Sequence, residues 1–144
     1  MNSSKYIDEV QVYSDGGCKP NPGVMVGAFV VTDGQNIIKG PISFELGQGT
    51  NIVAEFKAIE KALDETVACT RKKVFVHCDN EFVVKALNKE RRITKRIHLK
   101  PIIADIYKKS TLFTDVSYIH VSEKNKYIMK CDSECGLLLT RLGI

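Results

Sequence analysis

The segment Val24–Thr32 constrains the fold of this chain more than any other stretch of its sequence. It reads Val-Met-Val-Gly-Ala-Phe-Val-Val-Thr and contains no charged residue. A strand that lacks alternation of polar and apolar residues is typical of a position with both faces of the sheet covered. The dipeptide Asp33-Gly34 follows and is a strong hairpin signal. We therefore expect a central strand, covered on both faces, that turns back into a neighbouring antiparallel strand.

Short connections on either side of this segment predict a three-stranded antiparallel meander. Residues 1–8 are polar and are expected to fray, and the alternating pattern that follows predicts a first strand that stops at Asp15. A third strand is expected over residues 35–44, where Pro41 indicates an edge position or a bulge. Residues 45–49 are expected to form a loop.

Helical and strand patterns alternate through the rest of the chain. The expected elements are a helix capped by Thr50 or Asn51 and ending near Val67, a strand Val74–Cys78 parallel to the first, a helix from Asn80 to Leu87, a helix starting near Pro101, a strand Asp115–Val121, and a final helix from about Glu123 to Leu142 with Leu137, Leu138 and Leu142 facing inward. This order predicts an α/β fold with a mixed five-stranded sheet, three antiparallel strands and then parallel additions, flanked by helices. A length of 144 residues fits a single domain over 1–144.

Three carboxylates stand at the boundaries of these elements. Asp15 ends the first strand, Glu55 begins the first long helix, and Asp79 follows the fourth strand. An Asp-Gly-Gly sequence is by itself most often a turn. Here Gly16 and Gly17 are expected to leave the backbone open to a ligand. The three acids together are able to converge on divalent metal.

The ordered set of motifs resembles the type 1 ribonuclease H family. The motifs are Tyr13-Ser14-Asp15-Gly16-Gly17 with Asn21-Pro22-Gly23, Thr50-Asn51 with Ala54-Glu55, and Cys78-Asp79-Asn80, which together span most of the chain. The resemblance implies a ribonuclease H-like fold and metal-dependent hydrolysis of the RNA strand of RNA–DNA hybrids. It also implies two Mg²⁺ ions, with Mn²⁺ as a possible substitute. Two such ions about 3.5–4 Å apart activate water, neutralise the phosphoryl oxygens and assist the departing oxygen.

The family holds its metals with four acids, of which the first three correspond to Asp15, Glu55 and Asp79. The fourth is expected in the final helix, four residues after an asparagine, but that position here is Met129. Asp132, seven residues after Asn125, is the candidate, because helix residues three apart share a face. Glu134 is the second choice. The alternative that the fourth ligand is lost, leaving a crippled site, stays open.

The resemblance also assigns substrate contacts. The backbone of Gly16, Gly17 and Cys18 and the side chains of Asn21 and Asn51 are expected to read the 2′-hydroxyl groups of RNA, while Thr50 and Asn80 correspond to positions that hold a DNA-strand phosphate, and Glu81 stands where glutamine is common. Ile52 replaces the second residue of a frequent Asn-Asn pair. The loop Val121–Lys124 is too short for the mobile histidine of longer family members, which indicates the short-loop branch. His77 and His120 are interpreted as structural, and His98 as a contact to substrate or solvent.

Positive charge is concentrated in one third of the chain. Residues 71–109 carry twelve Lys or Arg against four Asp or Glu, whereas residues 1–70 carry five against nine. Within this third, Arg91, Arg92, Lys95 and Arg96 stand where family members carry a basic handle for the duplex. Phosphate contacts there predict salt-dependent, sequence-independent binding. The chain has no tryptophan, so Phe82, Ile97 or Leu99 is expected to support the handle.

The remaining expectations concern compartment and partners. No apolar run approaches the ~18 residues of a membrane span, and no signal-peptide pattern is seen, so a cytoplasmic monomer with no membrane partner is expected. The five scattered cysteines are interpreted as free thiols. Two other functions stay open: a binding module of the same fold that has lost turnover, and a DNA nuclease or junction resolvase of the same fold.

Overall fold

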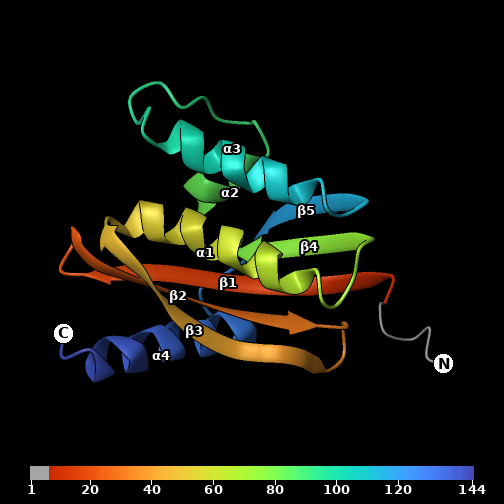
Figure 1. Ribbon diagram of the computed structural model, residues 1–144, viewed down its shortest axis with the longest axis horizontal. Coiled ribbons are helices and arrows are strands. Elements are labelled where there is room, and N and C mark those ends of the chain that lie inside the picture. Colours follow the sequence, from red (N-terminus) through yellow and green to blue (C-terminus); the bar gives the residue numbers. More distant parts are fainter. Residues whose placement is uncertain (1–6) are drawn as a thin grey trace.

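A mixed five-stranded sheet forms the centre of the structure, a computed structural model that describes residues 7–144 (Figure 1). The strands are β1 (Glu9–Lys19), β2 (Gly23–Thr32), β3 (Ile37–Gly49), β4 (Lys73–Cys78) and β5 (Asp115–His120). They lie in the order β3-β2-β1-β4-β5. β1 is antiparallel to β2 and parallel to β4, and β4 is parallel to β5. The predicted fold class is confirmed. The expected fraying concerns residues 1–8, of which residues 1–6 lie outside the described residues.

Four helices cover the two faces of the sheet. They are α1 (Asn51–Thr66), α2 (Glu81–Leu87), α3 (Leu99–Ser110) and α4 (Lys126–Arg141). α1, α2 and α3 lie on one face and α4 on the other (Figure 1). Thr50 and Asn80 cap α1 and α2 where these helices were predicted to start, because each side chain accepts a hydrogen bond from a backbone N–H in the first turn. Asn125 caps α4 in the same way, so this helix begins a few residues later than the expected Glu123.

The apolar segment of β2 contributes to two separate cores. Phe29 and Val31 pack with α1 and α3, whereas Val26, Ala28 and Val30 pack with α4. Successive side chains of a strand point to opposite faces, so a strand covered on both sides is apolar throughout. This confirms the interpretation of Val24–Thr32 as a fully covered strand.

Three expectations about these elements are wrong. β1 does not stop at Asp15 but runs on to Lys19, because its pairing with β2 continues as far as Lys19 opposite Val24. Residues 45–49 are not a loop, because they extend β3 along β2 after a register shift. Leu137 does not face inward and is 51% exposed, because α4 packs through Cys131 and Cys135, whereas Leu138 and Leu142 lie against that core as expected.

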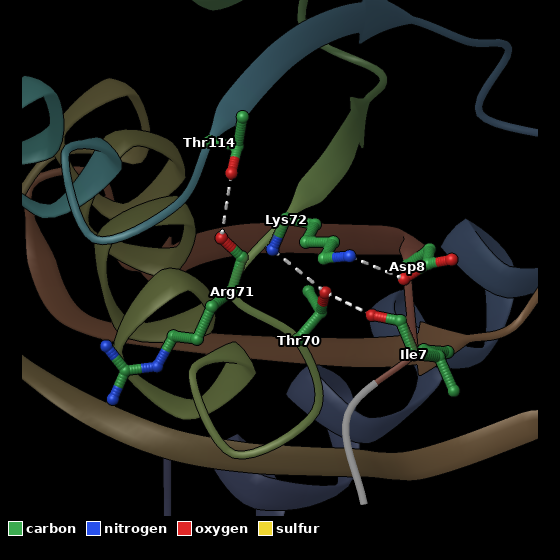
Figure 2. Close-up of polar contacts among 6 residues, drawn as sticks. All are labelled: Ile7, Asp8, Thr70, Arg71, Lys72 and Thr114. Atoms are coloured by element: carbon green, nitrogen blue, oxygen red, sulfur yellow. Dashed lines mark hydrogen bonds and ion pairs between the residues drawn. The ribbon is translucent and has the colours of Figure 1, made fainter. Parts of the chain in front are cut away.

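Hydrogen bonds tie the start of β1 to the segment between α1 and β4 (Figure 2). The buried Thr70 hydroxyl donates to the Ile7 carbonyl and accepts from the Lys72 N–H at 3.1 Å. The Lys72 ammonium pairs with Asp8 at 3.1 Å, and the Thr114 hydroxyl donates to the Arg71 carbonyl at 3.4 Å. β1, β4 and β5 therefore begin from one braced end and run in parallel toward the opposite end of the sheet.

Two further findings concern the described residues. Within 7–144, no helix is long and apolar enough to cross a membrane. All five cysteines are free, as predicted.

Helix α1 crosses β1 at very close range. A Cβ atom built on Gly16 would lie 2.3 Å from the carbonyl oxygen of Ala54 in α1, whereas one built on Gly17 meets nothing within 4 Å. Gly16 is therefore needed for the packing of α1, whereas Gly17 has open surroundings, and the predicted ligand contacts of both stay predictions.

We predict opposite effects of alanine at these two neighbouring glycines. Gly16→Ala forces α1 away from β1 and should lower the free energy of unfolding by at least about 1–3 kcal/mol, the usual cost of overpacking. Gly17→Ala should leave that free energy nearly unchanged. Urea unfolding followed by circular dichroism measures both. Equal stability of the two variants would contradict the close packing described.

Candidate active site

Asp15 lies near the middle of β1, at the point where that strand separates from its parallel neighbour. The last residue pair between β1 and β4 is Tyr13 with His77, so Asp15 projects beyond the end of the β1–β4 ladder. Its side chain is buried. Asp79 follows directly after Cys78, the last residue of β4. The two acids therefore share the carboxyl-end edge of two adjacent parallel strands, as the sequence predicted.

Glu55 reaches the same edge from α1. Its Oε1 accepts a hydrogen bond of 3.1 Å from the Gly16 N–H, across the close contact between helix and strand. The carboxylates of Glu55 and Asp79 and the thiol of Cys78 offer ligand atoms that all lie within 4.8 Å of one another. The structure thus brings the first three predicted acids together.

The fourth acid comes from α4. The charge of Asp132 contributes to the raised pKa values of Asp15 and Asp79, so the Asp132 carboxyl lies near both acids. Asp132 also lines a pocket together with Asp79 and Met129. Positions 129 and 132 therefore share a face of α4, and the role of Asp132 as the fourth metal ligand stays a prediction.

The gathered carboxylates raise one another's pKa values. Burial, followed by the charges of Asp79 and Asp132, raises the pKa of Asp15 to about 8 from its ordinary 3.8. Burial, followed by Asp15 and Asp79, raises the pKa of Glu55 well above its usual range. Burial also raises the pKa of Asp79, to which Glu123 and Asp132 add. Removing like charges from water and holding them together disfavours the ionised forms.

This donor set fits a hard divalent cation. Among residues 7–144, none of the ion pairs joins a Lys or Arg to any of the four acids. Mg²⁺ takes oxygen ligands, and one or two carboxylates together with water and substrate phosphate complete its shell. A cation bound here would relieve the repulsion that raises the pKa values. The residues that would hold it are Asp15, Glu55, Asp79 and Asp132.

A network of polar contacts joins the β1–β2 turn to the start of α1. The Asn51 side chain accepts from the Cys18 N–H at 2.9 Å, and the Asn21 side chain accepts from the Asn51 N–H at 3.2 Å. The Cys18 thiol donates to Asn21 at 3.3 Å. These three residues of the predicted substrate set are therefore held in one network, and Thr50 caps α1 beside them.

A pocket lies at the start of α1. Asn21, Thr50, Asn51, Ile52, Arg96 and His98 line this pocket of about 300 Å³. Arg96 belongs to the basic segment between α2 and α3, so its position in this pocket places that segment next to Asn21 and Asn51. His98, interpreted as a contact to substrate or solvent, lies there too.

The basic segment between α2 and α3 folds over an aromatic ring. The guanidinium groups of Arg91 and Arg96 lie 5.0 Å and 4.9 Å from the centre of the Phe82 ring. Phe82 and these two arginines line a pocket of about 290 Å³, to which Arg92 and Lys95 also contribute. Phe82 is therefore the aromatic that supports this segment, whereas Ile97 is 64% exposed and Leu99 belongs to the core.

The remaining predicted contacts lie at the start of α2. The Asn80 side chain accepts from the Val83 N–H at 3.1 Å and so acts as the helix cap. Glu81 pairs with Lys85 at 3.7 Å on the exposed side of the helix. These contacts explain the structural roles of both residues and leave their predicted contacts with a nucleic acid as predictions.

The histidines occupy structural places around the acids. His77 is buried, contacts the Val12 carbonyl at 3.1 Å and stacks on Tyr13 with ring centres 4.3 Å apart. A ring nitrogen of His120 contacts the Asp79 carbonyl at 3.2 Å and so helps to fix the backbone of that acid.

The sequence reasoning missed Glu123. This residue lies in the short loop before α4, lines the pocket with Asp79 and Asp132, and raises the pKa of Asp79 through its charge. An acid in the loop where longer family members carry a histidine was the signal that could have identified it.

A five-stranded sheet of this order, with carboxylates from β1, α1, β4 and α4 gathered at one edge, defines a protein of the ribonuclease H-like fold class. The RNase H family model matches residues 8–122. The chain belongs to the RNase H family. No curated protein sequence matches it significantly.

Solved structures agree with this fold. RNase H1 from the halophilic archaeon Halobacterium salinarum superposes with a TM-score of 0.84 at 24% identity, over 92% of this chain and 98% of that one. The N-terminal RNase H domain of a Mycobacterium tuberculosis protein gives 0.79 at 21% identity, over 94% and 99%. LC11-RNase H1 in complex with an RNA/DNA hybrid gives 0.74 at 22% identity, over 90% and 99%.

We predict that the metal-free protein loses stability as the pH rises from about 4 to 8. The folded protein retains the Asp15 proton up to a pKa of about 8, whereas the unfolded chain releases it near the ordinary 3.8. Protons are therefore bound more tightly by the folded state, whose stability decreases across this window. Calorimetry in EDTA should show a lower Tm at pH 8 than at pH 5, and Mg²⁺ should raise Tm more at pH 8.

Substitution of Asp15 tests the cause of this dependence. Asp15→Asn removes one of the repelling charges and should raise the metal-free Tm at pH 8 by at least about 2–4 °C, the shift for 1 kcal/mol in a chain of this size. Asp105→Asn, at an exposed position of α3, is the matched control and should leave the pH dependence unchanged. A pH dependence that persists in full in Asp15→Asn would contradict this explanation.

Proposed function

We propose that this protein is a metal-dependent endonuclease that hydrolyses the RNA strand of RNA–DNA hybrids with two Mg²⁺ ions. The observation that carries the proposal is the convergence of Asp15, Glu55, Asp79 and Asp132 on one edge of the sheet. Each acid comes from a different element, and their charges raise the pKa values of Asp15, Glu55 and Asp79. Such an arrangement is costly to the fold unless a cation offsets it.

The chain's own residues determine how the site would act. Bound divalent cations would supply an activated water and neutralise the phosphoryl oxygens. Asp15, whose pKa is raised by burial and by the charges of Asp79 and Asp132, would be a central carboxylate ligand of the bound cations. The Gly16 N–H holds Glu55 in position, and the His120 ring holds the Asp79 backbone. These contacts preorganise the ligands before substrate arrives.

Selection of a hybrid would depend on the polar network at the start of α1. Short polar side chains and backbone groups of Cys18, Asn21 and Asn51 suit the 2′-hydroxyl, which both donates and accepts hydrogen bonds. The pocket that contains Thr50 and Arg96 suits a backbone phosphate of the paired DNA strand. The fold shared with LC11-RNase H1, which was solved with an RNA/DNA hybrid, is consistent with this substrate.

A binding module without turnover is the second candidate function. Asp132 is exposed and stands three residues beyond the family's usual position, which is occupied by Met129. A fourth ligand that moves away from the metals would leave hybrid binding intact and remove hydrolysis. The same cleavage assay separates the two functions.

We predict cleavage of the labelled RNA strand of a hybrid in Mg²⁺ or Mn²⁺, and no cleavage of double-stranded RNA or DNA. Asp15→Asn should lower kcat by more than about 100-fold, because residues that only support metal ligands already contribute about 10- to 100-fold. Asp132→Asn should also lower kcat strongly, whereas Glu134→Gln on the same helix is the matched control and should stay close to the parent.

Other outcomes of this assay have distinct meanings. Tight hybrid binding without cleavage by the parent protein would favour the binding module. Cleavage of DNA would favour a DNA nuclease or junction resolvase of the same fold. Full activity of Asp132→Asn together with loss of activity in Glu134→Gln would assign the fourth ligand to Glu134 and not to Asp132.

We also predict that the basic segment binds the duplex through phosphates. The double substitution of Arg91 and Arg96 by alanine should weaken hybrid binding for all sequences alike and reduce the slope of log K against log salt by about one per lost contact. Lys61→Ala, at an exposed position of α1, is the matched control. Phe82→Leu keeps both charges but removes their aromatic support, and should give an intermediate loss. An unchanged salt slope in the double variant would place the duplex elsewhere.

A further inference from the structure

Cys78 places a thiol at the inner wall of the acidic site. It is the last residue of β4, directly before Asp79, and its side chain is fully buried. The backbone around it is fixed, because its carbonyl accepts a hydrogen bond of 3.0 Å from the Val121 N–H. The thiol therefore has a defined position behind the carboxylates.

The thiol and two carboxylates form a compact set of donors. The Cys78 Sγ lies 3.9 Å from Glu55 Oε1, and ligand atoms of Glu55, Cys78 and Asp79 all lie within 4.8 Å of one another. Zinc bound to sulfur at about 2.3 Å and to oxygen at about 2.0–2.2 Å separates tetrahedral ligands by roughly 3.3–3.7 Å. Small side-chain movements would thus suffice to close the three donors around one ion.

A second contact fixes the orientation of the sulfur. The Asn80 N–H donates to the Cys78 Sγ at 3.5 Å. Burial, followed by the charge of Glu55, raises the pKa of the Cys78 thiol well above its usual range, so a metal that binds the sulfur has to displace its proton. The inference therefore depends on the positions of the three donor groups.

We infer that Glu55, Cys78 and Asp79 form a binding site for thiophilic divalent cations such as Zn²⁺ and Cd²⁺, which displace Mg²⁺ from the candidate active site. The inference rests on the proposed metal site and adds sulfur to its ligands. Soft thiolate ligands select Zn²⁺ and Cd²⁺ over Mg²⁺, which prefers oxygen. On binding, the Cys78 S–H bond breaks, an S–metal bond forms, and the proton passes to solvent.

Occupation of this site would inhibit the nuclease. A tetrahedral ion held by sulfur and two carboxylates leaves one position for water or substrate. It uses Glu55 and Asp79, which the hydrolytic ions would share, and replaces their octahedral, water-rich shell. Trace amounts of Zn²⁺ or Cd²⁺ would then compete with Mg²⁺ for Glu55 and Asp79, because Cys78 supplies a sulfur ligand that favours these metals.

Titration of the full chain with Cd²⁺ alone, without nucleic acid, tests the site. Parent protein should develop the ultraviolet charge-transfer band of a Cd–thiolate bond, and calorimetry should give its affinity. Cys78→Ser and Cys78→Ala should lose the band and bind Cd²⁺ at least about tenfold more weakly, while the Mg²⁺ affinity stays unchanged. Cys69→Ser, a half-buried thiol beyond the far end of α1, is the matched control and should behave like the parent.

Four results would contradict the inference. A band of equal strength in Cys78→Ser and parent, or one that disappears in Cys69→Ser, would overturn the inference. Parent protein that binds Mg²⁺ normally but Cd²⁺ through oxygen alone would also overturn it and leave the proposed function intact. A chain that binds neither ion at these residues would contradict the proposed function as well.

Thermal unfolding by circular dichroism shows whether each variant is folded. Cys78 is buried, so the serine and alanine variants cover the chance that one of them fails to fold. A Cd²⁺-soaked crystal of the parent gives an independent reading. Its anomalous density should lie within bonding distance of Cys78 Sγ, and density bound only by carboxylates would overturn the inference.

Discussion

The hydrogen bond between the Gly16 N–H and Glu55 joins the central strand to the helix that covers it, and the geometry of the site follows from it. It forms only because β1 carries a glycine where the Ala54 carbonyl makes its closest approach. The same contact brings the α1 carboxylate to the edge where Asp15 and Asp79 lie. Packing and site assembly therefore share one local requirement, the absence of a side chain at position 16.

Assembly of the site works against the stability of the fold. Burial and mutual repulsion raise the pKa values of Asp15, Glu55 and Asp79, so each of these acids is more stable when neutral or bound to a cation. The opposite end of the sheet shows the contrasting arrangement, in which Thr70 and the Lys72–Asp8 pair satisfy one another. The chain thus concentrates unfavourable electrostatics at one edge and satisfied contacts at the other, a distribution expected where a site is built to bind an ion.

The strands and helices followed from local patterns, while their extents depended on neighbours. The uncharged segment of β2 predicted its own burial on both faces, and Thr50 and Asn80 marked helix starts. The extension of β1 beyond Asp15 and of β3 through residues 45–49 was not predictable, because glycine-rich sequence reads as turn until a partner strand pairs with it. Glu123 was missed for a similar reason, since a loop acid acquires meaning only when Asp79 lies beside it.

The position of Asp132 shows how packing can preserve a site when a motif's spacing changes. The thiols of Cys131 and Cys135, one helical turn apart, donate to the carbonyls of Tyr13 and Asp15 and so fix the register of α4 on β1. Asp132 follows Cys131 directly, and this register brings its carboxyl close enough for its charge to raise the pKa of Asp15. Met129, at the family's usual spacing, lies on the same helix face and lines the same pocket. The contact of a buried thiol with the strand, and not the distance along the chain from Asn125, therefore decides which helix residue faces the other acids.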